Sequence, residues 1–157
     1  SYVLLIVIAL GLAAGVYTWM KSNVPSETES CDENTAVIVR DYCLDNVAKT
    51  ISITFENKGY FDIKGVAMKA SKDVSQMPTI ALQSTDEINS GSTTGRYDFS
   101  ETLIPQDITT VLFSYTNLMT SILAKIRVQP FINGKEGPIY CDNYYDVTID
   151  QNRVCSV

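Results

Sequence analysis

The sequence predicts an α+β protein in which one long hydrophobic N-terminal helix is followed by an antiparallel β-sandwich. Three observations predict this fold class. Residues 1–20 contain no charge and no proline, several later segments alternate apolar and polar residues with a period of two, and all four cysteines follow the apolar segment. We therefore expect an assembly or membrane-spanning helix at residues 1–24, a neck at residues 25–34 and a β domain at residues 35–157.

The helix comes first, and its first charged residue is Lys21. At 1.5 Å per residue, about 20 residues span roughly 30 Å, the thickness of a bilayer's hydrocarbon core. Tyr2 lies at one end and Trp19 at the other, where aromatic rings favour the membrane interface. The apolar run begins at the second residue with no basic stretch before it, unlike a secretory signal peptide. We expect instead that a peptidase has removed a leader and left the apolar segment on the mature chain.

Small residues recur along this helix at intervals of four. Gly11 and Gly15 form a G-x-x-x-G spacing, and Ala14 and Thr18 lie on a similar face. Small residues at this interval let helix backbones approach closely, which favours helix association in an apolar environment. We interpret these four residues as packing positions between copies of the chain. The same composition also suits an ordinary single-span anchor.

After the neck, where Pro25 and a polar, acidic cluster end the helical pattern, period-two alternation predicts short strands. The clearest lie at residues 36–42, 50–55, 62–68, 108–115 and 122–131, and weaker candidates lie at 79–83, 96–99, 138–141 and 144–149. Residues 118–125 are the one stretch that could form a helical turn instead. Many short strands without a helix between them fit an antiparallel sandwich of immunoglobulin-like type.

The four cysteines are Cys31, Cys43, Cys141 and Cys155, and no pair has the Cys-x-x-Cys spacing of a zinc or redox site. An even number beyond the apolar segment predicts two disulfides in an oxidising compartment. The strand at residues 36–42 rises about 3.3 Å per residue and separates Cys31 from Cys43, whereas bridged Cα atoms lie within about 7 Å. We expect the first strand region to be bridged to the C-terminal segment, with both remaining pairings open.

Composition excludes several classes of function. The chain has 12 basic and 18 acidic residues and a pI of about 4.5, which argues against a nucleic-acid partner. Histidine is absent, which removes the commonest general base and metal ligand. We therefore expect no enzymatic activity, no catalytic residue, no cofactor and no bound metal.

Two acidic clusters are candidates for binding. Glu27, Glu29, Asp32 and Glu33 lack the spacing of an EF-hand, so we interpret them as solvated neck charge and not as calcium ligands. The second cluster is an acidic and aromatic series near the C-terminus, which could form a surface for sugar or partner contacts or a simple ladder of exposed residues. It consists of Asp142, Asp146 and Asp150 with Tyr140, Tyr144 and Tyr145.

The uncharged helix at a processed terminus, the small-residue interval, the Pro25 neck and the all-β remainder together resemble archaeal type IV pilins and their adhesion-filament relatives. Residues 55–63, FENKGYFDI, also resemble a strand-turn-strand of immunoglobulin-like adhesion modules in archaeal surface proteins. Bacterial pilins usually carry a glutamate where this chain has Leu5 and an aromatic residue where it has Ser1. That departure favours the archaeal branch and leaves subunit registration without its charged guide.

The resemblance implies a homopolymeric helical filament at the cell surface, with the helices bundled inside and the β domains outside. It also implies that a prepilin peptidase cuts the leader, that the subunit waits in the membrane, and that an assembly platform extracts it. Alternatives are an archaellum filament subunit, a minor pilin, or a single-span surface protein whose β domain binds a ligand.

Overall fold

The computed structural model describes residues 2–23, 30–87, 89–118 and 122–155. Within these ranges it contains one long helix, one short 3-10 turn and ten strands. The elements are α1 (Tyr2–Asn23), β1 (Val37–Asp45), β2 (Thr50–Asn57), β3 (Ile63–Ser71), β4 (Ile80–Ala81), β5 (Gln83–Ser84), β6 (Arg96–Leu103), β7 (Ile108–Ser114), the 3-10 turn (Thr116–Leu118), β8 (Lys125–Asn133), β9 (Pro138–Tyr140) and β10 (Tyr145–Thr148).

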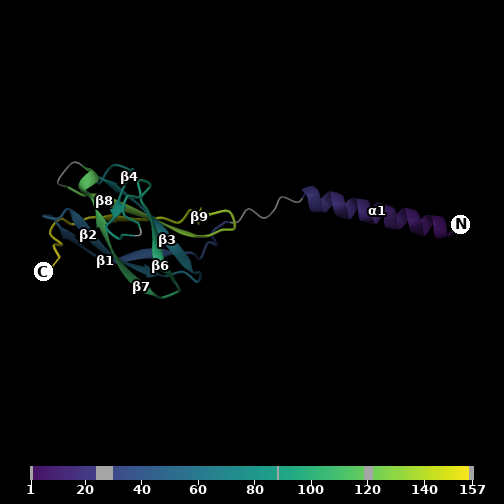
Figure 1. Ribbon diagram of the computed structural model, residues 1–157, viewed down its shortest axis with the longest axis horizontal. Coiled ribbons are helices and arrows are strands. Elements are labelled where there is room, and N and C mark those ends of the chain that lie inside the picture. The colour runs from purple at the N-terminus through teal and green to yellow at the C-terminus, as the bar shows by residue number, and fades with distance from the viewer. Residues whose placement is uncertain (1, 24–29, 88, 119–121, 156–157) are drawn as a thin grey trace.

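The predicted helix followed by antiparallel β-structure is confirmed. Figure 1 shows α1 apart from the β domain, with β9 at the end of the domain nearest to it. The helix runs from Tyr2 to Asn23, within the predicted residues 1–24. Most of the predicted neck, residues 25–29, lies outside the described residues.

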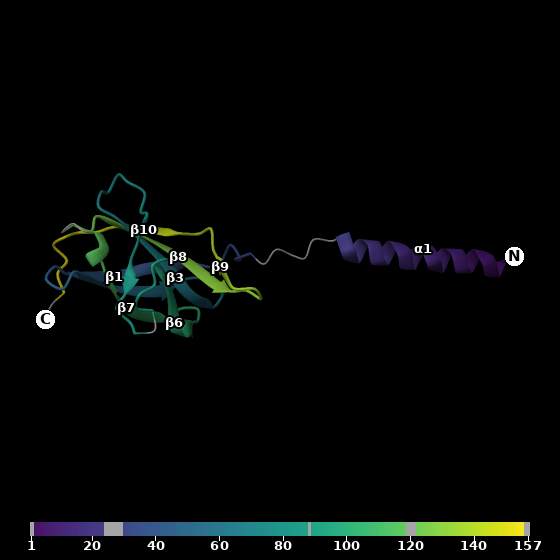
Figure 2. The same cartoon turned by 45° about the horizontal axis from the view of Figure 1, so that its top comes forward.

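The described strands form two sheets. Sheet A has the order β1-β2-β7-β5, and sheet B has the order β10-β8-β3-β4, with β6 paired to β3 and β9 paired to β8. All pairs of named strands are antiparallel. Figure 2 shows β8 beside β3 and β10 along the same sheet. Side chains from both sheets share one apolar core.

Alternation explains which side chains enter that core. In β2, Ile51, Ile53 and Phe55 are buried while Ser52 and Thr54 are partly exposed. In β3, Val66, Met68 and Ala70 are buried in the core. Since successive strand residues point to opposite faces, this pattern leaves the other face of each sheet available to polar residues.

The chain crosses from one sheet to the other at Leu82. A single strand was predicted at residues 79–83, but Ile80–Ala81 pair with β3 and Gln83–Ser84 pair with β7. Leu82 is buried between them, and its N–H donates to the carbonyl of Met68 at 3.1 Å. The alternation of apolar and polar residues correctly predicted extended structure at residues 79–83. It could not reveal that the pairing partner changes from β3 to β7 within this segment.

The segment before β8 also differs from the prediction. The strand begins at Lys125 and not at residue 122, and the alternation that predicted the earlier start fails there, since Leu123 and Ala124 are both buried. The helical turn considered at residues 118–125 was wrong for its described part, since only Leu118 belongs to the 3-10 turn and residues 122–124 have no regular structure. Residues 119–121 lie outside the described residues.

Gly65 allows a close approach on the outer face of sheet B. A Cβ atom there would meet the carbonyl oxygen of Tyr97, and would lie 2.5 Å from the ring of Phe131. Both neighbours are held, because Tyr97 belongs to β6 and the Phe131 ring packs between Tyr140 and the guanidinium of Arg96. Any side chain at position 65 must therefore displace backbone.

We predict that Gly65→Ala lowers the free energy of unfolding by about 1–3 kcal/mol, as overpacking of a filled site does. Urea unfolding of the full chain in detergent micelles, followed by near-ultraviolet circular dichroism, measures this. Gly15→Ala is the control, because no atom lies within 4 Å of its added Cβ. An unchanged midpoint for Gly65→Ala would show that the site can relax.

Candidate functional site

The first candidate is the surface of α1. Every residue from Tyr2 to Met20 is exposed, and none of this apolar stretch is buried against the rest of the described chain. The helix has 22 residues and is long and apolar enough to cross a membrane. A helix that is apolar all round needs lipid or other protein around it, because water solvates such a surface poorly.

There is open space beside the predicted packing residues Gly11 and Gly15 of α1. No atom lies within 4 Å of a Cβ built on Gly11 or Gly15. The hydroxyl of Thr18 donates to the carbonyls of Ala14 at 2.9 Å and Gly15 at 3.0 Å, so the polar group is satisfied inside the helix. The face is therefore small and apolar. Whether it contacts another helix stays a prediction.

The four cysteines form two disulfides, Cys31–Cys141 and Cys43–Cys155, and no described cysteine is free. Both join the first strand region to the C-terminal segment, as expected, and the structure selects one of the two pairings left open. Register decides the choice, because Leu44 and Val154 form a parallel bridge that brings Cys155 alongside Cys43. The local pair Cys31–Cys43 does not form.

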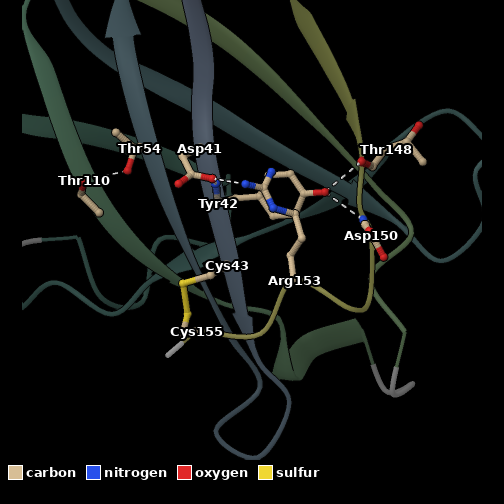
Figure 3. A network of polar contacts seen from close by, with 9 residues as sticks. All are labelled: Asp41, Tyr42, Cys43, Thr54, Thr110, Thr148, Asp150, Arg153 and Cys155. Carbon is tan, nitrogen blue, oxygen red and sulfur yellow. Dashed lines mark hydrogen bonds and ion pairs between the residues drawn. A yellow bond between two sulfur atoms is a disulfide. The ribbon is translucent and has the colours of Figure 1, made fainter. Parts of the chain in front are cut away.

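A polar network closes the edge of β1 beside the second disulfide (Figure 3). The backbone N–H of Asp150 donates to the hydroxyl of Tyr42 at 2.9 Å, and that hydroxyl donates to the carbonyl of Thr148 at 3.4 Å. The guanidinium of Arg153 lies 4.7 Å from the centre of the Tyr42 ring and pairs with Asp41. This network joins β1 of sheet A to the segment that follows β10 of sheet B.

The acidic and aromatic series near the C-terminus does not form one acidic surface. Asp146 accepts two hydrogen bonds from Arg127 at 2.7 and 2.8 Å and lies 3.1 Å from the amine of Lys125. These contacts, with the Arg127 hydrogen bonds the largest, lower the pKa of Asp146 from its ordinary value. Asp150 accepts from the backbone N–H of Asn152 in a turn. Only part of the series therefore presents uncompensated charge.

The tyrosines of that series have separate environments. The ring of Tyr140 packs on Phe131 at 5.5 Å. The ring of Tyr144 lies against the guanidinium of Arg127 at 3.8 Å. Tyr145 opens β10 and is exposed. Sequence reasoning missed Arg127, although the alternation of Lys125, Arg127 and Gln129 along one strand marks a polar outer face.

The neck carboxylates are only partly described, because Glu27 and Glu29 lie outside the described residues. Asp32 accepts hydrogen bonds from the backbone N–H and the side-chain amide of Asn34, at 2.9 and 3.0 Å. Within the described ranges no group of three or more His, Cys, Asp or Glu residues could hold a metal ion. Asp32 therefore caps a turn in this structure.

No protein-family model, no curated protein and no solved structure matches the chain.

We predict that peptide mapping without reduction will recover peptides linked Cys31 to Cys141 and Cys43 to Cys155. The two loops span 110 and 112 residues, and closing a loop of that size stabilises a fold by about 5 kcal/mol in the chain-entropy model. Replacing Cys43 and Cys155 together by serine should therefore lower the unfolding midpoint strongly. A Cys31 to Cys155 peptide would contradict the register that we describe.

We also predict a pH-dependent effect of Asp146→Asn. Because the folded-state pKa of Asp146 is lowered, its ion pairs stabilise the fold above the ordinary carboxyl pKa, and this stabilisation is lost as pH falls through the lowered pKa. The variant should lose about 1–2 kcal/mol at neutral pH. Its difference from the parent should shrink in acid. Asp142→Asn is the control, and a difference independent of pH would contradict the assignment.

Proposed function

We propose that the chain is a structural subunit of an archaeal type IV pilus-like surface filament, with α1 bundled among copies of itself and the β domain outside. One observation carries this proposal. The helix presents apolar side chains on all sides from Tyr2 to Met20 and buries none of them within the described chain. That surface must be covered by something other than this subunit.

The transfer free energy of its side chains favours an apolar environment for α1, first the lipid of the membrane and then neighbouring helices. Transfer of one large apolar side chain out of water is worth about 1.5–3 kcal/mol, so the helix as a whole has a preference for an apolar environment of tens of kcal/mol. A free subunit is then held in the membrane. Packing against neighbouring helices exchanges lipid for protein, which small residues such as Gly11 and Gly15 promote by close backbone approach.

The cellular compartment that the disulfides of the β domain indicate supports the proposal. An N-terminal apolar helix and two disulfides indicate an extracellular or secreted protein. We propose further that the domain is immunoglobulin-like. Its orders β1-β2-β7-β5 and β10-β8-β3 correspond to the A-B-E-D and G-F-C strands of that fold. A compact module of this kind on the outside of a filament is suited to contacts with surfaces.

The partners in this proposal are other copies of the same chain, the membrane before assembly, and the processing peptidase and assembly platform that the resemblance implies. An acidic chain without histidine supports neither a nucleic-acid partner nor an enzymatic role.

A single-span surface protein is the second candidate function. The observation that favours it is the position of Tyr17 and Trp19 near one end of the apolar stretch, which suits a helix that remains in a bilayer. The two functions differ in whether α1 contacts copies of itself.

We predict that Gly11→Leu with Gly15→Leu abolishes filaments, because the added side chains keep neighbouring helices apart. Negative-stain microscopy of material sheared from cells that make the variant measures this. The matched control is Gly11→Ala with Gly15→Ala, which keeps small residues at both positions and should still assemble. Near-ultraviolet circular dichroism should show an unchanged β domain in both variants. Normal filaments from the leucine variant would exclude packing through this face.

A further inference from the structure

A groove of about 330 Å³ lies on the outer face of sheet B, and neither α1 nor the edge closed by the Cys43–Cys155 disulfide contributes to its lining. Its floor comes from strands β3 and β8, one wall comes from the loop between β3 and β4, and the other comes from the segment that leads into β10. The residues that line it include Lys69, Met77, Arg127, Gln129, Asp142 and Tyr144. These residues all lie within the part of the chain that the structure describes.

The aromatic wall is held rigidly. Tyr144 is 55% exposed, and the guanidinium of Arg127 lies 3.8 Å from the centre of its ring, so Arg127 covers one face of the ring and leaves the other face for a ligand. Arg127 in turn donates two hydrogen bonds to Asp146, which fix the guanidinium plane. A ligand that packs against this tyrosine therefore loses little side-chain entropy of the protein. Met77, which is 66% exposed, provides an apolar surface on the opposite wall.

The polar groups of the groove include both donors and acceptors. Lys69 is exposed, and none of the described carboxylates forms an ion pair with it, so its amine is available to donate. Gln129 donates to the carbonyl of Cys141 at 2.8 Å, which orients its amide oxygen as an acceptor. The hydroxyl of Thr79 and the carboxylate of Asp142 complete the set.

This combination selects among ligand classes. Arg127 is neutralised by Asp146, and Asp142 adds negative charge, so the groove lacks the cluster of cations that a phosphate or a nucleic acid requires. A purely apolar ligand would displace water from the four polar side chains without supplying hydrogen bonds in return, which is costly. A sugar ring has an apolar face that can pack on an aromatic ring and hydroxyl groups that both donate and accept at its edge.

We propose that this groove is a carbohydrate-binding site that takes one pyranose unit of an oligosaccharide, with its apolar face against the side of the Tyr144 ring opposite Arg127 and its hydroxyl groups toward Lys69, Gln129 and Asp142. The volume is at the lower end of the range for small-molecule sites, about 300–1,000 Å³, as suits a single ring. The site does not require polymerisation. If the chain assembles as a filament, repeated weak sites act together through avidity.

Saturation-transfer-difference NMR tests this with the full chain in detergent micelles and four probes: cellohexaose, the hexamer of N-acetylglucosamine, mannohexaose and hexagalacturonate. We expect transfer to the ring protons of at least one probe. Tyr144→Ala should weaken binding of that probe by at least about tenfold, or 1.4 kcal/mol. Tyr144→Phe, which keeps the ring, should bind nearly as well as the parent.

Two further variants keep the result unambiguous. Lys69→Ala removes an exposed donor without an ion pair, so it should weaken binding while leaving the fold unchanged. Tyr60→Ala removes a tyrosine that is 79% exposed outside the groove and should bind normally. Absence of transfer to all four probes at millimolar concentration would overturn the proposal. Binding that survives both Tyr144→Ala and Lys69→Ala would overturn it as well.

Discussion

Four aromatic rings join the two sheets at the centre of the β domain. Phe55 and Phe113 belong to sheet A, and Tyr97 and Phe99 belong to β6 of sheet B. Their edge-to-face contacts form a closed set with ring centroids 5.6 to 6.1 Å apart. Each such contact contributes about 0.5–1.5 kcal/mol beyond area burial. Because every ring contacts two others, the set fixes both the spacing of the sheets and their lateral alignment. The hydroxyl of Tyr97 donates to Asp86, and burial is the main cause that raises its pKa to about 12.

These rings set the alignment of the two sheets, and this alignment positions β1 and β10 at the edge of the domain that the second disulfide and the polar network close. β1 and β10 belong to different sheets, yet Tyr42 hydrogen-bonds to residues at and just after the end of β10. The C-terminal segment then pairs with Leu44 and places Cys155 beside Cys43. An exposed strand edge is a template for unwanted pairing, and this closure removes part of it. The disulfide and the polar contacts stabilise the domain at this edge.

The proposed assembly helix and the proposed binding groove lie in different parts of the chain. The described helix carries no charge between Tyr2 and Met20, whereas the groove depends on charged and polar residues of β3, β8 and the approach to β10. None of the groove residues lies near the packing positions of α1 in the sequence. The proposed exchange of lipid for protein neighbours around the helix would therefore not alter the groove. Substitutions in one part should leave the other part unaffected, which allows the two proposals to fail independently.

The sequence by itself determined the helix, the antiparallel β character and the location of the disulfides between the first strand region and the C-terminal segment. Each of these depends on local signals, such as an uncharged run of 20 residues or the alternation of Ile51, Ile53 and Phe55. Only the tertiary structure decided that Cys43 pairs with Cys155, that the chain changes sheets at Leu82, and that Arg127 lies between Asp146 and Tyr144. The groove likewise exists only because β3, β8 and a loop meet. The physical reason is that alternation reports which face of a strand is buried, whereas the partner across the sheet is set by contacts between residues far apart in the chain.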